Sequence, residues 1–249
     1  MESVEAAKAT SRAINELGGA FMTAGSTFAR GGELGFGGLD FYVLGRGGVL
    51  GDTTAEVVTS AFIVWNPEAI ATQWESGRAV MSPAEAANEW AAVCASFGEA
   101  NLPDFEGYAR LNELMAAVVV GASPACAALF AGWRTLPTPG ADAPKALAQH
   151  LLNSLRELRG GLHGGALLAN GLTPLEAVAF SSPYMAGIFG WDAETLPDGA
   201  AFKERWKAAE AATNVAMGVP LSVLNETELA EFVELTTALH AAVQAAKEA

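Results

Sequence analysis

Cysteine, histidine and basic residues are scarce in this sequence. It has two cysteines and three histidines among 249 residues, and 14 basic residues against 28 acidic ones. Cys94 and Cys126 alone make neither a disulfide framework nor a paired-cysteine metal site. The net charge of −14 and the pI near 4.6 repel nucleic-acid phosphate and anionic membranes unless a local basic face overrides them. Composition therefore argues against nucleic acid as a partner.

Long apolar segments are also missing. The most continuous apolar run is 114–120, whereas a membrane-spanning helix needs roughly 20 residues. The first residues, MESVEAAKATSRAINEL, lack the basic region and apolar core of a secretory signal. With so little cysteine, we expect a cytoplasmic protein without a membrane partner.

Strand patterns are nearly absent, whereas helix starts are frequent. Ser82-Pro83 and Thr173-Pro174 place a capping side chain before a proline, and Glu85 and Glu176 complete capping boxes. The valines lie among alanines at helical spacing. These patterns predict an all-α fold that ends in a long amphipathic helix over 226–247, which could also support a homodimer.

A proline-rich stretch divides the chain. LPTPGADAP, residues 136–144, predicts a linker between an N-terminal helical half, 1–135, and a C-terminal helical half, 145–249. The halves echo each other, because VLGDTTAEVV and NGLTPLEAVAF each precede a Trp-Asn or Trp-Asp pair. Either internal duplication or chance similarity between alanine-rich helices explains the echo.

The stretch HLLNSLRELRGGLHGGALLANG, residues 150–171, gathers two of the three histidines. Its spacing predicts helices over 144–158 and 164–169, with Gly160-Gly161 ending the first one. His150 and Glu157 fall on one polar stripe of the first helix. A carboxylate there could orient the imidazole and raise its pKa.

The same stretch carries groups suited to an anionic ligand. Arg156 and Arg159 precede the predicted break, and His163 follows it beside the bare backbone of 164–165. An imidazole and guanidinium groups at a helix start favour an anion or a carboxylate. We therefore expect His163 to be a polar contact or general base, His150 with Glu157 an orienting or proton-relay pair, and the two arginines charge contacts.

Tyr42, Trp65 and Trp191 lie near the glycine-rich breaks and predict the aromatic wall of a pocket between the halves. No HExxH or Glu-x-x-His spacing occurs, so neither a metal nor a cofactor is expected. An alternative interpretation is structural: arginines before Gly-Gly also cap a helix, and histidines and aromatic residues also fill a core.

Three segments together resemble a known family. They are LRELRGGLHGGALLANGLTPLEAV, GDTTAEVVTSAFIVWNPEAI and the later spacing of Gly190, Trp191, Asp192, Glu194 and Trp206. They are similar to a family of largely uncharacterised actinobacterial all-α proteins described by helix-turn-helix-like domains. Its central pattern, Trp-His followed by Arg-Glu-His-Arg-Gly-Asp-Gly-His, is matched by His150, Arg156, Glu157, Arg159, Gly160 and His163. The chain departs from it at Gln149, Leu158, Gly161 and Leu162.

The resemblance implies two helix-turn-helix-like halves packed together, but a fold alone does not decide a function. The main hypothesis is a protein that binds a small anionic or carboxylated organic molecule between the halves, either as a binding protein or as a cofactor-independent enzyme. The alternative is a DNA-binding transcriptional regulator. The helices expected after Gly51 and Gly171 carry no basic residue, which argues against that alternative.

Overall fold

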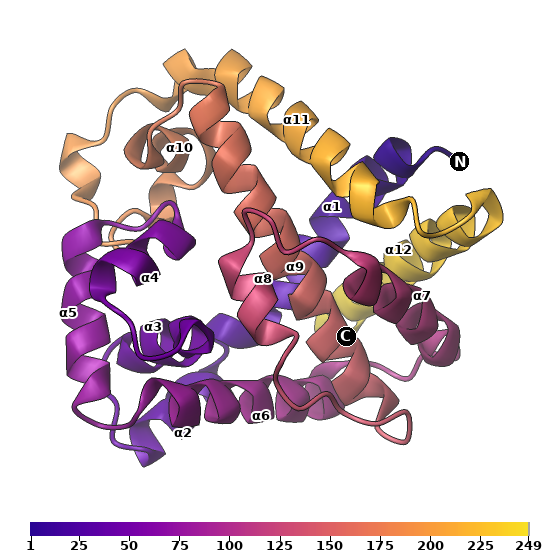
Figure 1. Cartoon of the computed structure of the whole chain (residues 1–249), viewed down its shortest axis with the longest axis horizontal. Helices are drawn as coiled ribbons and strands as arrows, with labels where there is room; N and C mark the ends of the chain where they lie inside the picture. Colours follow the sequence, from indigo (N-terminus) through magenta and orange to yellow (C-terminus); the bar gives the residue numbers. More distant parts are fainter. Residues whose placement is uncertain (249) are drawn as a thin grey trace.

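The structure, a computed structural model, describes residues 1–248 as helices and loops with no strand among them, so the all-α prediction is confirmed (Figure 1). Short 3-10 turns (η1–η5) lie between some of the helices. The α-helices are α1 (Ser3–Gly19), α2 (Gly25–Glu33), α3 (Asp40–Gly47), α4 (Ala55–Phe62), α5 (Pro67–Arg78), α6 (Pro83–Asn101), α7 (Tyr108–Gly121), α8 (Ala128–Trp133), α9 (Pro144–Ala169), α10 (Pro174–Ser181), α11 (Lys203–Leu221) and α12 (Glu226–Glu248).

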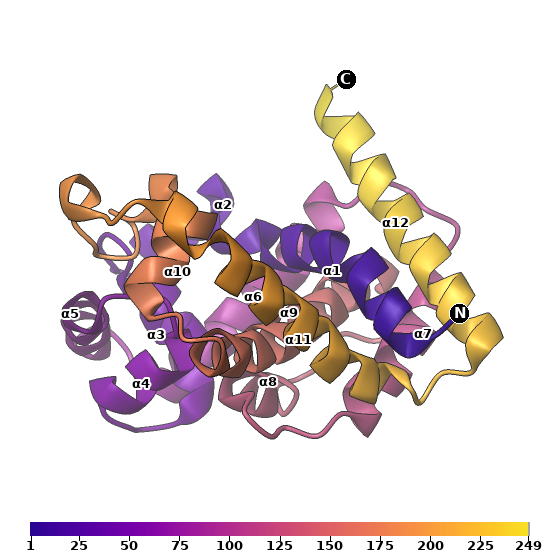
Figure 2. The same cartoon turned by 90° about the horizontal axis from the view of Figure 1, so that it is seen from above.

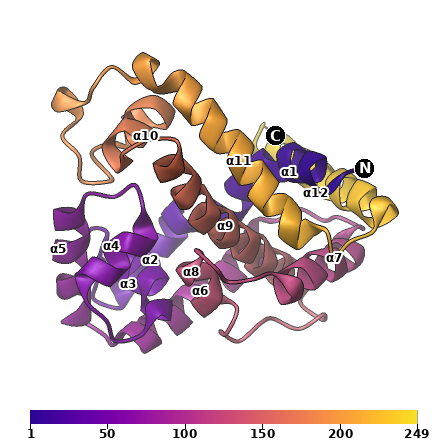
Figure 3. The same ribbon diagram turned by 45° about the horizontal axis from the view of Figure 1, so that its top comes forward.

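Helix α9 is the centre of the molecule. It packs against α1, α6, α7, α8 and α11, and Figure 3 shows it running between α6 and α11. Leu152, Leu155 and Leu158 of α9 are almost fully buried in a cluster that also contains Leu114 of α7 and Phe232 of α12. The main core therefore combines residues from both expected halves, and the division at 136–144 stays a prediction.

The predicted break at Gly160-Gly161 is wrong, because α9 runs unbroken from Pro144 to Ala169. A Cβ on Gly161 would lie 2.6 Å from the Cα of Ala127, so this glycine lets the chain before α8 approach the helix. The helix ends instead at Ala169, just before Gly171, whose φ of +72° suits glycine. The amides of Gly171 and Leu172 bond to the carbonyls of Leu168 and Leu167, which caps the last turn.

The helix starts at Ser82 and Thr173 and the C-terminal helix match the prediction. Ser82 and Thr173 accept hydrogen bonds from the amides of Glu85 and Glu176, which close both capping boxes. Helix α12 packs on α1 and α7, and its C-terminal part projects from the rest of the molecule (Figure 2). A homodimer through α12 stays a prediction. No helix of residues 1–248 is long and apolar enough to cross a membrane.

The two echo segments lie against each other. The amide of Asn66 donates to the carbonyl of Phe189 at 2.8 Å, and the indole Nε1 of Trp191 donates to the carbonyl of Val64 at 2.8 Å. The rings of Trp65 and Phe189 are 5.2 Å apart. These contacts fix one wall of the cavity described next, whereas internal duplication stays a prediction.

Candidate functional site

A cavity of about 490 Å³ lies between α1, α3, α9, α11 and the loop after α10. We call it the polar cavity. Of the residues predicted from sequence, it brings together Tyr42, Trp65, Arg156, Arg159 and His163. Its walls come from both expected halves of the chain.

An ion cluster of Arg46, Glu157 and Arg156 forms one side of this cavity. Arg46 bonds to both carboxylate oxygens of Glu157, with Nε to Oε1 at 2.9 Å and Nη2 to Oε2 at 2.8 Å. Nη1 of Arg156 bonds to the same Oε1 at 3.2 Å. The side chains of Glu157, Arg46 and Arg156 are 3%, 12% and 23% exposed. Two guanidinium groups therefore share one buried carboxylate.

The cluster keeps its charges. Burial disfavours the charged form of Glu157, yet the charge and hydrogen bonds of Arg46, supported by Arg156, hold its pKa below the usual value. Burial also opposes the charge on Arg46, but the attraction of Glu157 raises its pKa. The cluster consequently carries one net positive charge near neutral pH.

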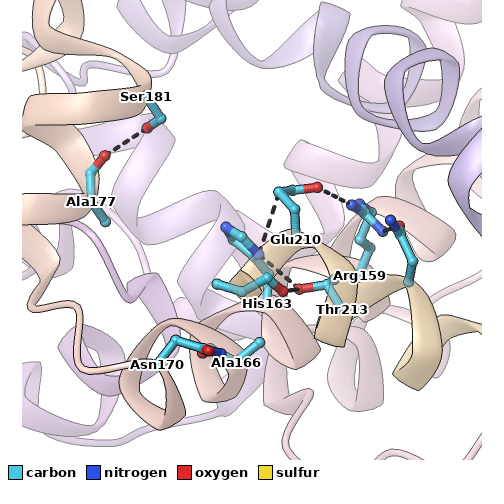
Figure 4. A network of polar contacts seen from close by, with 10 residues as sticks. Arg159, His163, Ala166, Asn170, Ala177, Ser181, Glu210 and Thr213 are labelled. Atoms are coloured by element: carbon cyan, nitrogen blue, oxygen red, sulfur yellow. Dashed lines mark hydrogen bonds and ion pairs between the residues drawn. The ribbon is translucent and has the colours of Figure 1, made fainter. Parts of the chain in front are cut away.

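His163 also lines the cavity and is held by α11. Its Nδ1 is 2.9 Å from Oγ1 of Thr213, and that hydroxyl donates to the carbonyl of Ala209 (Figure 4). Because the hydroxyl proton is already committed, Nδ1 of the imidazole is the donor. Its Nε2 is therefore the atom that can accept a proton, and Figure 4 shows it pointing away from Glu210 and Thr213.

Arg159 and Glu210 support this histidine. Nη2 of Arg159 bonds to Oε2 of Glu210 at 2.7 Å, and Nη1 bonds to Asn214 (Figure 4). The other oxygen of Glu210 is 3.5 Å from Nδ1 of His163. Burial lowers the pKa of His163, opposed by the charge of Glu210 and reinforced by that of Arg159. The imidazole is therefore neutral at pH 7.

Aromatic rings complete the cavity. Tyr42 stacks on Trp65 with centroids 5.2 Å apart, and Trp206 meets the ring of His163 edge-on at 5.0 Å. The guanidinium of Arg46 lies 4.6 Å from the centroid of Phe62. Flat apolar faces beside a cationic cluster suit a planar molecule that carries a negative charge.

His150 lies elsewhere, and the predicted His150–Glu157 pair is wrong. His150 is 3% exposed and stacks on Trp133 with centroids 4.8 Å apart, outside the polar cavity. Two helical turns separate it from Glu157, about 10 Å along the axis, which is too far for a hydrogen bond. Burial without a carboxylate partner lowers its pKa to about 4, whereas the sequence predicted a rise.

Trp191 does not line the polar cavity. Its indole instead donates to the carbonyl of Val64 and so holds the segment that carries Trp65.

The sequence analysis missed three candidates for the site: Arg46, Trp206 and Glu210. Trp206, Glu210 and Thr213 recur at i, i+4 and i+7 of α11, a spacing that could have grouped them on one face. No sequence signal joins Arg46 to Glu157, since the two are 111 positions apart.

Comparison with known proteins adds one finding. A family model described as a helix-turn-helix family matches residues 7–211, which include every residue that lines the polar cavity. The chain belongs to this helix-turn-helix family. Neither the curated proteins nor the solved structures contain a match. The actinobacterial source implied by the resemblance stays a prediction. Within residues 1–248, no three His, Cys, Asp or Glu side chains gather as a metal site requires.

Proposed function

We propose that the polar cavity binds a small organic anion with a planar, apolar body, such as an aromatic carboxylate. The observation that carries this proposal is the sharing of buried Glu157 by Arg46 and Arg156. An uncompensated positive charge in a sheltered site is costly, and a ligand carboxylate would neutralise it. Guanidinium groups also match the geometry of a carboxylate.

The neighbouring acids support this reading, because each already has a cationic partner. Glu210 bonds to Arg159, and Glu16 bonds to Arg12 at 2.7 Å. Among the described residues, Nη2 of Arg156 donates to no acceptor. A ligand oxygen beside Arg156 would supply that acceptor without breaking an existing ion pair.

The role of His163 separates a binding protein from an enzyme. A neutral imidazole with a free Nε2 can accept a hydrogen bond from the ligand, or it can take a proton from it as a general base. The second role needs no cofactor, since the proton moves from the ligand to Nε2. In both roles, Nε2 of His163 is the atom that contacts the ligand.

The test compares two ligands of the same shape. Calorimetric titration with 2-naphthoate and with the uncharged 2-naphthamide should give clearly tighter binding of the acid. Arg156→Met should weaken naphthoate at least about tenfold, a loss of about 1.4 kcal/mol, and change naphthamide less than about twofold. Equal binding of acid and amide, or no effect of the Arg156 variant, would contradict the proposal.

The matched control is Arg78→Met. Arg78 is a surface arginine of α5 that pairs with Asp52 and Glu75, away from the polar cavity. This variant should bind naphthoate like the wild type. Melting curves of both variants should show that they are folded, because Arg156 also packs on Gly18 and Gly19.

A second proposal, DNA binding, is favoured by family membership and by the short α4–α5 pair, in which α5 would read a groove. Charge opposes it. The exposed face of α5 carries Glu68 and Glu75, and its one arginine, Arg78, is paired with acids. An electrophoretic shift at low salt with DNA flanking the gene would favour this proposal, and no shift would end it.

A further inference from the structure

A second cavity, of about 590 Å³, lies beside the polar cavity along α9. We call it the apolar cavity. Its walls come from α4, the chain before α8, the glycine-rich part of α9 and the start of α10. The surface of these walls is mostly apolar and includes the side chains of Ile63, Pro124, Leu129, Leu167, Leu172 and Pro174. Its volume lies in the range of roughly 300–1,000 Å³ that small-molecule sites occupy.

The charges at this cavity are already neutralised. Its charged lining residues are Arg46 and Glu157, and these bond to each other through two hydrogen bonds. Arg156, which adds the excess charge, lines the polar cavity and not this one. The apolar cavity therefore favours an uncharged molecule, because a charged one would lose its hydration without gaining a counter-ion.

Four glycines of α9 border this cavity, and close packing explains two of them, Gly161 and Gly164, but not Gly160 and Gly165. A Cβ on Gly161 would collide with Ala127, and one on Gly164 would lie 2.7 Å from Cδ1 of Ile63. A Cβ on Gly160 or Gly165 would meet nothing within 4 Å, and both residues line the apolar cavity. Glycine inside a helix is destabilising relative to alanine. Gly160 and Gly165 therefore lower the stability of α9, and they leave its backbone uncovered by side chains at the cavity.

We propose that the apolar cavity binds an uncharged, apolar small molecule that lies against the bare backbone of α9 at Gly165. The site is separate from the polar cavity, although Arg46, Ile63 and Gly160 form a shared wall. The inference does not depend on the anion proposed for the polar cavity.

The test uses the neutral fluorescent probe N-phenyl-1-naphthylamine. Gly165→Leu places an isobutyl group in the cavity and should weaken the probe at least about tenfold. Gly165→Ala should weaken it less and should raise the melting temperature by roughly 2 °C, because alanine favours the helix. The control is Gly32→Leu in α2, where a Cβ also meets nothing within 4 Å. It lies outside this cavity and should leave the probe's affinity unchanged.

Cys126 reports where the probe sits. It is exposed and lines the apolar cavity, whereas the other cysteine, Cys94, is fully buried. Saturating probe should slow the reaction of Cys126 with 5,5′-dithiobis(2-nitrobenzoate) in the wild type, and the same probe concentration should have much less effect in Gly165→Leu. Saturating 2-naphthoate, which we expect to bind in the polar cavity, should not displace the probe.

Three results would overturn the inference: unchanged probe affinity in Gly165→Leu, no protection of Cys126, or displacement of the probe by naphthoate. Displacement would place the probe in the polar cavity. Failure of naphthoate to bind at all would count against the proposed function and would leave the inference about the apolar cavity standing.

Discussion

Helix α9 passes through two different environments. Before Arg156 its residues line neither cavity and pack among the neighbouring helices, whereas from Arg156 onward it borders both cavities. Each part holds one histidine. His150 stacks on Trp133 in the buried interior, whereas His163 is held by Thr213 at the edge of a cavity. Two histidines of one helix thus have different environments, because the packing around each differs.

The largest effect is expected at Glu157, where the two parts of α9 meet. Glu157→Ala leaves Arg46 and Arg156 buried without their carboxylate, which should cost about 3–5 kcal/mol of unfolding free energy. Urea unfolding measures the loss. Glu75→Ala on the surface of α5 is the control and should cost less than about 0.5 kcal/mol. A loss below about 1 kcal/mol at Glu157 would mean that the cluster is not held as described.

Two leucines compare the parts directly. Leu158 is 1% exposed in the core, whereas Leu168 is 67% exposed in the later part of the helix. Leu158→Ala should therefore cost about 2–5 kcal/mol, and Leu168→Ala about 0.5 kcal/mol or less. Chemical denaturation of both variants checks the difference. Similar losses would contradict the contrast between the two parts.

Acid should destabilise the protein through His150. Unfolded His150 takes up a proton near pH 6.5, but the folded form does so only near pH 4. The unfolded state therefore binds more protons between these values, and stability falls as the pH falls, by about 3 kcal/mol in total from this group. We expect the free energy of unfolding to fall less steeply between pH 7 and pH 4 in His150→Phe than in the wild type. Phenylalanine keeps the stacking on Trp133 but cannot take up a proton. An unchanged slope would show that His150 is not the group responsible.

His163→Gln should have a small effect on stability and a clear effect on binding. His163→Gln keeps a polar side chain next to Thr213, so we expect a loss of about 1 kcal/mol. Naphthoate binding should weaken, whereas His150→Phe should bind naphthoate like the wild type. Calorimetry on the two variants compares their affinities for naphthoate. A loss of binding in His150→Phe with none in His163→Gln would contradict the prediction.

The comparison also explains what the sequence could predict. Capping by Ser82 and Thr173 depends on residues within one helical turn, so those helix starts were predictable. Gly161 was misread as a helix end because its role depends on Ala127, which is distant in sequence. The sequence places Arg156, Arg159 and His163 close together, but the bond between Arg46 and Glu157 and the setting of His150 depend on tertiary packing that local patterns do not encode.

The most direct measurement is ¹⁵N NMR of the imidazole nitrogens during titration with 2-naphthoate. We expect Nδ1 of His163 to be protonated and its Nε2 to respond to the ligand, while both nitrogens of His150 stay unchanged. A response from His150 with none from His163, or no response from either while naphthoate binds, would contradict the central claim that the later part of α9 forms the site.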